Sequence, residues 1–402
     1  MKATVHGAAP RWRFIALSDY VRPPEPAGEK VRRSIWGLWD RLVGKDRTTD
    51  PAVPNLRGER AILMDLAAAP PDWQEAVAAL DQSLQHWLRS GRNGNPLKLI
   101  LNPPSSGVHQ IVSRWAADNH WKVIKPPPAR QLLTGDNDRL RELDASEEAP
   151  WLLPALEEWH LRHHNGLDPV RQLLDLLACR RQLTLVCCDS WAWAYLCGTV
   201  QADLVLPAPL VPAAFDRDCL TGWFRALTRL NGNGPVIIRQ LQNGRCIMPA
   251  AEDEIEAAAQ QPETADFLGR LAAYSRGIPG VAWELWRHSL SFAVLADEAE
   301  ATEVKPTVWM SPWQEIELPG IPQRNQDRFA FVLHTLLLHN GVSAALLPEL
   351  LPNLGPQVRR DLQQLHVAGL AGEENRVWRV TALGYPVARN FLASEGYLVD
   401  SI

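Results

Sequence analysis

Short apolar segments alternate with amphipathic helical segments between residues 97 and 239, and this alternation constrains the fold more than any other feature. A helix between two strands favours parallel pairing, because it carries the chain back to the edge where the first strand began. The sequence therefore predicts a three-layer α/β domain with a mainly parallel sheet. The expected strands are Leu97–Leu101, Trp121–Ile124, Leu183–Cys188, Asp203–Leu206 and Val236–Arg239. The expected helices include Val108–Ala117, Leu153–His164, Pro169–Arg180, Trp191–Cys197 and Arg217–Leu230.

The composition excludes several classes of protein. A chain of 402 residues is long enough for two or three domains, and its net charge of −5 argues against a globally basic nucleic-acid binder. It contains no run of 18 apolar residues, and Met1–Pro10 lacks the apolar region of a secretory signal. The six cysteines form no paired CxxC pattern, so a reducing, cytoplasmic location is expected.

The loop between the expected strand Leu97–Leu101 and the expected helix Val108–Ala117 has the spacing of a phosphate-binding loop. In the pattern G-x-x-x-x-G-K-[ST], Gly107 aligns with the second glycine and Asn102 with the first. Val108 then takes the place of the lysine, and His109 takes the place of the Ser/Thr that binds magnesium. The same spacing fits an ordinary βα turn equally well.

Asp189 ends the apolar run LTLVCC, where a Walker B aspartate would hold magnesium through water. Ser190 follows it, where many ATPases have a catalytic glutamate. An aspartate at this place is also a common N-cap of the following helix, and this second interpretation is favoured.

Residues 271–290 read LAAYSRGIPGVAWELWRHSL and predict two amphipathic helices separated by a Gly-Ile-Pro-Gly turn. This segment resembles the lid of AAA+ and STAND-type ATPases, especially the Orc/Cdc6-like branch. In that family a small-Gly-x-Pro turn opens the helix that carries the sensor-2 arginine. The corresponding position holds Gly280, and Arg276 is out of register.

The last 77 residues predict three helices followed by a hairpin. The helices are Arg328–His339, Ala344–Leu351 and a third from Gly355 to about Ala368, and the hairpin surrounds Gly372–Arg376. This order resembles a winged-helix domain, which also follows the lid in Orc/Cdc6 and STAND proteins. Residues 324–402 contain seven Arg and no Lys against seven Asp and Glu, which is a weak charge for a duplex binder. The candidate nucleic-acid or partner face is formed by Arg359, Arg360, Arg376 and Arg379.

Together these features predict a P-loop NTPase-like core with a parallel sheet, a helical lid and a C-terminal winged helix. The expected domains are a basic Trp-bearing arm (1–60), a degenerate P-loop core (61–245), a lid (246–305), a linker (306–325) and a winged helix (326–402).

The resemblance implies ATP and magnesium binding coupled to assembly or switching, but the chain departs from the family at four key positions. The lysine, Ser/Thr, catalytic glutamate and sensor-2 arginine are all replaced, and phosphoryl transfer depends on such positioned charges. We therefore predict a non-catalytic pseudo-ATPase that serves as an adaptor or scaffold in a larger protein assembly. No cofactor, metal or small-molecule substrate is expected. The alternatives are an ATP-regulated DNA-binding protein that uses the winged helix and a peripheral membrane adaptor that uses the N-terminal amphipathic helix.

The segment Lys30–Gly44 predicts a short basic helix with tryptophan on its apolar side. It can pack on its own domain, enter a partner's groove, or lie on an anionic membrane surface through residues 30–43. The candidate partner or membrane anchors are Trp36 and Trp39 of this arm and Trp309 and Trp313 of the linker.

The segment EEWHLRHH contains residue types that bind metals. On a helix, Glu157, His160 and His164 would share a face, which permits metal ligation. A solvated helix end is the favoured interpretation, because the segment does not match HExxH.

Overall fold

The computed structural model describes residues 11–24, 67–91, 94–135, 138–143, 147–229, 237–241, 244, 246–248, 262–291 and 307–402. The chain divides into two compact units, each built from separated parts of the sequence. The first unit comprises Met1–Val21, Trp73–Ala213 and Leu318–Ile402, and the second comprises Arg22–Asp72 and Ala214–Glu317.

The first unit contains a six-stranded sheet in the order β1-β6-β2-β5-β4-β3, in which only β1 is antiparallel to its neighbour. The mixed α/β class with a mainly parallel sheet is therefore confirmed. The strands are β1 (Phe14–Ala16), β2 (Leu97–Asn102), β3 (Lys122–Val123), β4 (Trp151–Leu153), β5 (Thr184–Asp189) and β6 (Leu210–Pro212).

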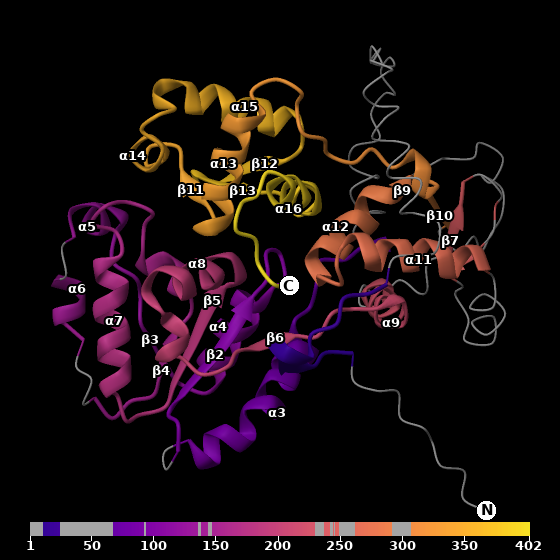
Figure 1. The fold of residues 1–402 in the computed structure, drawn as a ribbon. Helices are drawn as coiled ribbons and strands as arrows, with labels where there is room; N and C mark the ends of the chain where they lie inside the picture. Colours follow the sequence, from indigo (N-terminus) through magenta and orange to yellow (C-terminus); the bar gives the residue numbers. More distant parts are fainter. Residues whose placement is uncertain are drawn as a thin grey trace, which may run out of the picture. The chain divides into compact units, whose positions relative to one another are not determined.

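Helices cover both faces of this sheet (Figure 1). The connections β2–α4–β3 and β5–α8–β6 leave neighbouring strands in opposite directions, so right-handed crossovers place α4 and α8 on opposite faces. The helices are α3 (Gln74–Ser90), α4 (Val108–Asp118), α5 (Ala129–Thr134), α6 (Asp138–Arg141), α7 (Asp168–Cys179) and α8 (Ser190–Val200). Three short 3-10 helices complete the layer: η1 (Leu17–Asp19), η2 (Leu156–Trp159) and η3 (Ala202–Leu204).

Large apolar side chains fill the space between these layers. The chain contains 17 tryptophans. Core packing accounts for Trp115, Trp151, Trp159 and Trp191, which are almost completely buried.

Two local predictions are wrong. The helix expected over Leu153–His164 is replaced by β4 and the short η2, because Pro154 disfavours helical geometry in the residue before it. The strand expected over Asp203–Leu206 is instead η3 and the turn after it, which follow Gln201 in the left-handed conformation. Leu206 is buried there without strand pairing, since an apolar run indicates burial rather than a particular backbone conformation.

The second unit contains its own four-stranded sheet, in the order β8-β7-β10-β9. Its strands are β7 (Ile237–Gln240), β8 (Cys246–Met248), β9 (Leu290–Ser291) and β10 (Thr307–Met310), and its helices are α9 (Arg217–Arg229), α11 (Pro262–Tyr274) and α12 (Pro279–Ser289). The strand expected over Val236–Arg239 thus belongs to this sheet and not to the large one. It pairs in parallel with β10, about 70 residues away, and such a distant partner leaves no local pattern in the sequence.

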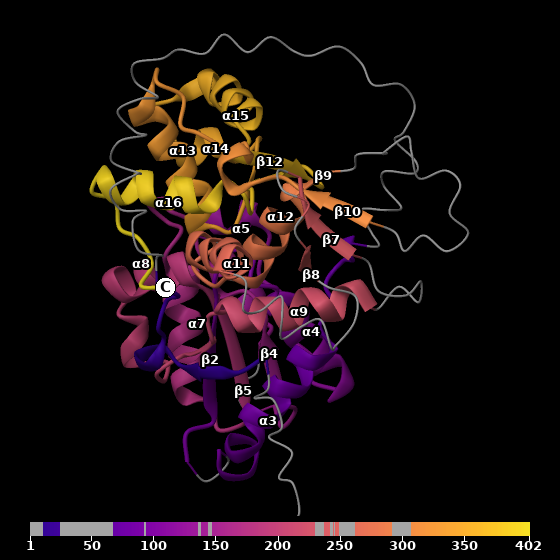
Figure 2. The same cartoon turned by 90° about the vertical axis from the view of Figure 1, so that its right-hand side faces the viewer.

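The remaining elements of the first unit form the C-terminal subdomain, defined as residues 326–402. It contains α13 (Gln326–Leu338), β11 (Val342–Ser343), α14 (Leu347–Leu350), η5 (Gly355–Gln357), α15 (Val358–Val367), β12 (Ala371–Glu374), β13 (Val377–Val380) and α16 (Tyr385–Ser394). The strands form an antiparallel sheet in the order β11-β13-β12. Helix α13 packs on α15 and α16 and also contacts α8, so the subdomain lies against the α/β layers (Figure 2).

Within the described ranges, no helix combines the length and the hydropathy that a bilayer span requires.

Candidate functional site

The neighbouring strands β2 and β5 mark the place where ligands bind in sheets of this kind. The helices that follow them leave toward opposite faces, and at such a point of an open α/β sheet ligands bind beyond the carboxyl ends of the two strands. We call this place the crevice. Asn102 and Asp189 are paired as the last residues of these strands. The structure therefore brings together six of the residues selected from the sequence: Asn102, Gly107, Val108, His109, Asp189 and Ser190.

The loop from Asn102 to Gly107 is closed by its own hydrogen bonds. The backbone N–H of Ser106 donates to the carbonyl oxygen of Pro103 at 3.0 Å, and its hydroxyl donates to Asn102 Oδ1 at 2.9 Å. The same hydroxyl accepts from the backbone N–H of Val108 at 3.4 Å. A phosphate-binding loop presents unpartnered N–H groups to its anion, whereas at least two of these groups are engaged here.

An indole ring covers the glycine of this loop. Gly107 has φ +81°, and a Cβ added to it would lie 2.4 Å from the Trp73 ring. The Trp73 ring in turn packs edge-on against Trp12, at 5.7 Å between ring centroids. In other loops a glycine lets a phosphate approach the backbone closely. Here the Trp73 ring occupies that space.

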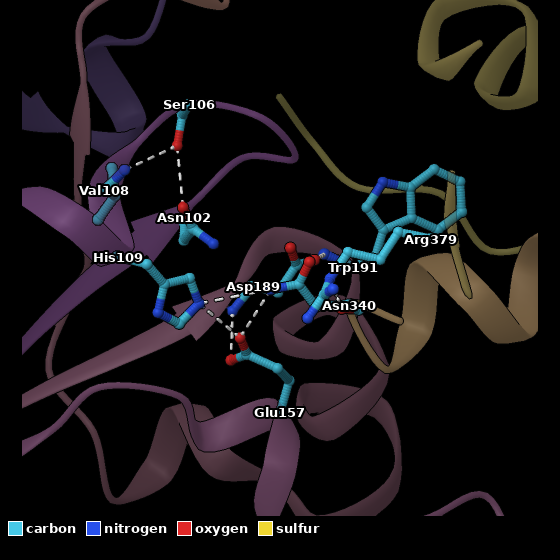
Figure 3. A network of polar contacts seen from close by, with 9 residues as sticks. All are labelled: Asn102, Ser106, Val108, His109, Glu157, Asp189, Trp191, Asn340 and Arg379. Carbon is cyan, nitrogen blue, oxygen red and sulfur yellow. Dashed lines mark hydrogen bonds and ion pairs between the residues drawn. The ribbon is translucent and has the colours of Figure 1, made fainter. Parts of the chain in front are cut away.

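The two residues at the lysine and Ser/Thr positions point in different directions. Val108 is completely buried. His109 Nε2 lies 2.9 Å from Glu157 Oε1, and the Asn340 amide donates to the same oxygen at 3.3 Å (Figure 3). Glu157 therefore connects the first turn of α4 to the C-terminal subdomain.

Glu157 and His109 form a hydrogen-bonded acid–base pair at this place. Burial alone would lower the pKa of His109, but the hydrogen bond and the charge of Glu157 raise it above its ordinary value. Burial would likewise raise the pKa of Glu157, but His109 and the backbone N–H of Asp189 lower it. A carboxylate whose pKa is lowered thus lies hydrogen-bonded to an imidazole whose pKa is raised.

Asp189 is held as a helix cap. Its Oδ1 accepts from the backbone N–H of Trp191 at 2.9 Å, and its own N–H donates to Glu157 Oε2 at 2.9 Å. Burial, and then the charge of Glu157, raise the pKa of Asp189 well above its ordinary value. A carboxyl group must be ionised to bind a metal, so this geometry favours the N-cap interpretation over a magnesium aspartate.

Replacing Asp189 by Asn is expected to keep the stability of the first unit at or above that of wild type at pH 7.5, because Asn caps helices as well as Asp does. The raised pKa of Asp189 means that its ionisation opposes folding above pH 3.8, and Asn removes that cost. Asp189→Ala removes the cap and should cost about 1 kcal/mol. Native-state hydrogen exchange of α8 measures both changes. Equal losses in the two variants would contradict the cap assignment.

Ser190 is bound by a residue far away in the sequence. Its hydroxyl donates to Asp400 Oδ2 at 2.7 Å, and the Tyr385 hydroxyl donates to the same oxygen at 3.1 Å. Arg389 donates to Asp400 Oδ1 at 2.8 Å and to the Asp400 carbonyl oxygen at 2.7 Å. These four side chains form the Asp400 cluster, which joins α8 to α16 and is almost entirely buried.

The four arginines of the predicted nucleic-acid or partner face come from three elements of the C-terminal subdomain. Arg359 and Arg360 are exposed on α15, and Arg376 is exposed in the β12–β13 turn. Arg379, although largely exposed, donates to the carbonyl oxygen of Asn340 at 3.0 Å and so lies beside the crevice.

The remaining candidates lie elsewhere. Gly280 is the second residue of α12 in the second unit. Trp309 lies on β10 and Trp313 in the 3-10 helix η4 (Trp313–Glu315), and both are partly buried. The Trp313 ring packs edge-on against Phe267 and Tyr274 of its own unit. Trp36 and Trp39 lie outside the described residues.

Glu157 is the central residue that the sequence analysis placed wrongly. It does not share a helical face with His160 and His164, because η2 ends at Trp159 and His160 is extended. Among the residues that the structure describes, no group of three His, Cys, Asp or Glu is arranged to hold a metal. The signal that could have located Glu157 is an acidic pair shortly after an apolar strand that ends at Pro154.

No protein-family model matches the chain, and no curated protein matches it. Among solved structures, it is similar to a Walker-type ATPase of Pyrococcus abyssi, with 14% identity over 81% of this chain and 96% of that one, and a TM-score of 0.30. It is also similar to the ORC2 protein of Aeropyrum pernix, solved as ADPNP–ADP complexes, with 12% identity over 88% of this chain and 97% of that one, and a TM-score of 0.32. At these TM-scores, the similarity to either structure supports no conclusion about the site.

Proposed function

We propose that the chain is a non-catalytic member of the AAA+/STAND-like, Orc/Cdc6-like ATPases that acts as an adaptor or scaffold in a larger protein assembly. The observation that supports this most directly is the hydrogen bond between the buried Glu157 and the partly buried His109 in the crevice at the ends of β2 and β5. A polyphosphate entering this crevice would meet a buried carboxylate that is already hydrogen-bonded to His109, and it would have to displace both groups.

The neighbouring positions support the same proposal. Val108 supplies no positive charge for a β- or γ-phosphate, and Ser190 is bound to Asp400. Asp189 caps α8 with one carboxyl oxygen, and burial raises its pKa well above the ordinary value, which opposes the ionisation that magnesium binding requires. Catalysis of phosphoryl transfer consists mostly of positioned charges, so the four replacements together favour loss of turnover.

The C-terminal subdomain is the proposed partner-binding part, and we interpret it as a winged helix. Its helix α15 exposes Arg359 and Arg360, while the β12–β13 hairpin exposes Glu373 and Glu374. The two carboxylates would repel a phosphate backbone beside the hairpin, whereas a protein surface can offer groups of both signs. This favours a protein partner over duplex DNA.

The proposal is tested in two arms on the full chain. In the nucleotide arm, 1 mM Mg-ATP should leave the thermal unfolding unchanged, and calorimetry should detect no binding. A site with a Kd of about 10 μM would stabilise the protein by about 2.7 kcal/mol at that concentration. Such a shift would overturn the pseudo-ATPase proposal.

In the partner arm, nuclease-treated affinity capture compares wild type with Arg359→Glu/Arg360→Glu. A defined protein retained by wild type and lost by the variant is expected. A shift assay with duplex DNA at several salt concentrations runs in parallel. Binding that weakens steeply with salt and disappears in the variant would support the DNA alternative instead.

A further inference from the structure

Three histidines lie between the α/β layers and the C-terminal subdomain, all buried and within one unit. We name His160, His334 and His339 the histidine seam. His160 follows η2 on the α/β side, whereas His334 and His339 belong to the end of α13. The rings of His160 and His339 are 5.1 Å apart, and His160 also stacks on Tyr195 of α8 at 5.6 Å.

The hydrogen bonds of the seam require unprotonated nitrogens. The backbone N–H of Arg162 donates to His339 Nε2 at 3.4 Å, and the Arg162 guanidinium lies 3.5 Å from His334 Nδ1. Arginine can only donate, so both ring nitrogens must accept. A proton on either nitrogen would break the contact and place an imidazolium against Arg162.

His160 is equally unsuited to a positive charge. It is completely buried, and neither of its ring nitrogens has a hydrogen-bond partner in the structure. A protonated imidazole carries two N–H donors, and here both would remain unsatisfied in an apolar setting.

A positive charge on the seam could be offset only by the groups that face it. The ionisable and aromatic groups that face it are Glu157 of η2, Arg162 after η2, Trp191 and Tyr195 of α8, and Tyr397 after α16. Arg171 acts on Tyr195, and Asp327 and Glu395 act on Tyr397. Among the described residues, Glu157 is the one carboxylate that acts directly on a seam histidine, and it is hydrogen-bonded to His109.

We propose that the histidine seam is a proton-operated release: protonation of its buried imidazoles separates the C-terminal subdomain from the α/β layers and uncovers the crevice around Glu157. The device is independent of the nucleotide proposal, because it depends on contacts between α8, α13 and the segment after η2.

The sign of the pH dependence follows from burial. Burial lowers the pKa of His160 to about 4, and burial and then Arg162 lower the pKa of His334 to about 4. The pKa of His339 is also lowered, by burial and then by the other two histidines. Once the subdomain has separated, the exposed histidines would bind protons below pH 6.5. In the assembled unit the same histidines bind protons only at lower pH, so acid favours separation. Between pH 7 and pH 5, the equilibrium constant for separation should rise about 20-fold for each of His160 and His334, and about 400-fold for the two together.

The test follows hydrogen exchange of the full chain between pH 7.5 and pH 4.5, with rates corrected for intrinsic exchange. We expect the protection of α8 and α13 to fall near pH 5 while β2 and β5 stay protected. His334→Gln/His339→Gln keeps two neutral acceptors for Arg162 and should move the release at least about one pH unit lower. His334→Arg should release the subdomain already at pH 7.5.

His86→Arg is the matched control, because this histidine is exposed on α3 and its substitution should change nothing. Three results would overturn the proposal. They are constant protection of α8 and α13 down to pH 4.5, simultaneous loss of protection in β2 and β5, and an unchanged release pH in the double Gln variant.

Discussion

Replacing Arg389 by Ala is expected to lower the free energy of unfolding of the first unit by about 3–5 kcal/mol, which is the cost of leaving a buried charge without its partner. The Asp400 side chain is completely buried, and Arg389 is its only cationic partner among the described residues. Ser190 and Tyr385 would remain as donors but carry no charge. Native-state hydrogen exchange of β5 and α16 measures the loss.

The control for this prediction is an exposed pair. Arg171 and Asp168 lie 2.9 Å apart on α7, with about half of each side chain exposed, and Arg171→Ala should cost less than about 1 kcal/mol. The double variant Arg389→Ala/Asp400→Ala removes both charges and should be more stable than Arg389→Ala alone. If the single and double variants are equally unstable, charge burial is not the cause.

Replacing Glu157 by Ala is also expected to lower the free energy of unfolding of the first unit by about 3–5 kcal/mol. The variant leaves the backbone N–H of Asp189 and the ring of His109 without their acceptor, and it removes the contact to Asn340. Glu158 is its exposed neighbour, so Glu158→Ala is a matched control with an expected change under about 0.5 kcal/mol.

The Glu157 effect should depend on pH in a defined direction. His109 has a raised pKa, so its share of the stability is fully present below pH 6.5 and is lost as pH rises through the raised value. Glu157 has a lowered pKa, so its share is present above pH 4.5 and is lost as pH falls through the lowered value. The difference between wild type and Glu157→Ala should therefore be largest between about pH 4.5 and 6.5. Chemical denaturation at several pH values checks this, and a difference that grows above pH 8 would contradict it.

The sequence predicted those features that local pattern determines. Alternating strands and helices indicated the parallel sheet, and the apolar runs ending at Asn102 and Asp189 located the ends of β2 and β5. Pro154 ended the expected helix and placed Glu157 in a 3-10 turn, which the apolar periodicity of that segment did not reveal.

The contacts that complete the site could not be predicted in this way. Asn340 lies 183 positions from Glu157, and Asp400 lies 210 positions from Ser190. Neither pair leaves a periodic signal, because their approach depends on how the C-terminal subdomain packs on α8. The site thus combines a locally encoded crevice with residues that only tertiary packing brings to it.

The interleaved order of the two units has a consequence for biosynthesis. β1 pairs with β6 across about 200 residues, and the segments of the second unit are synthesised between those of the first. Asp400 and Ile402 are both buried in the first unit, so its core remains incomplete until nearly all of this chain has left the ribosome. We expect slow folding with a long-lived partly exposed α/β layer during translation, which is the stage at which a chaperone would bind.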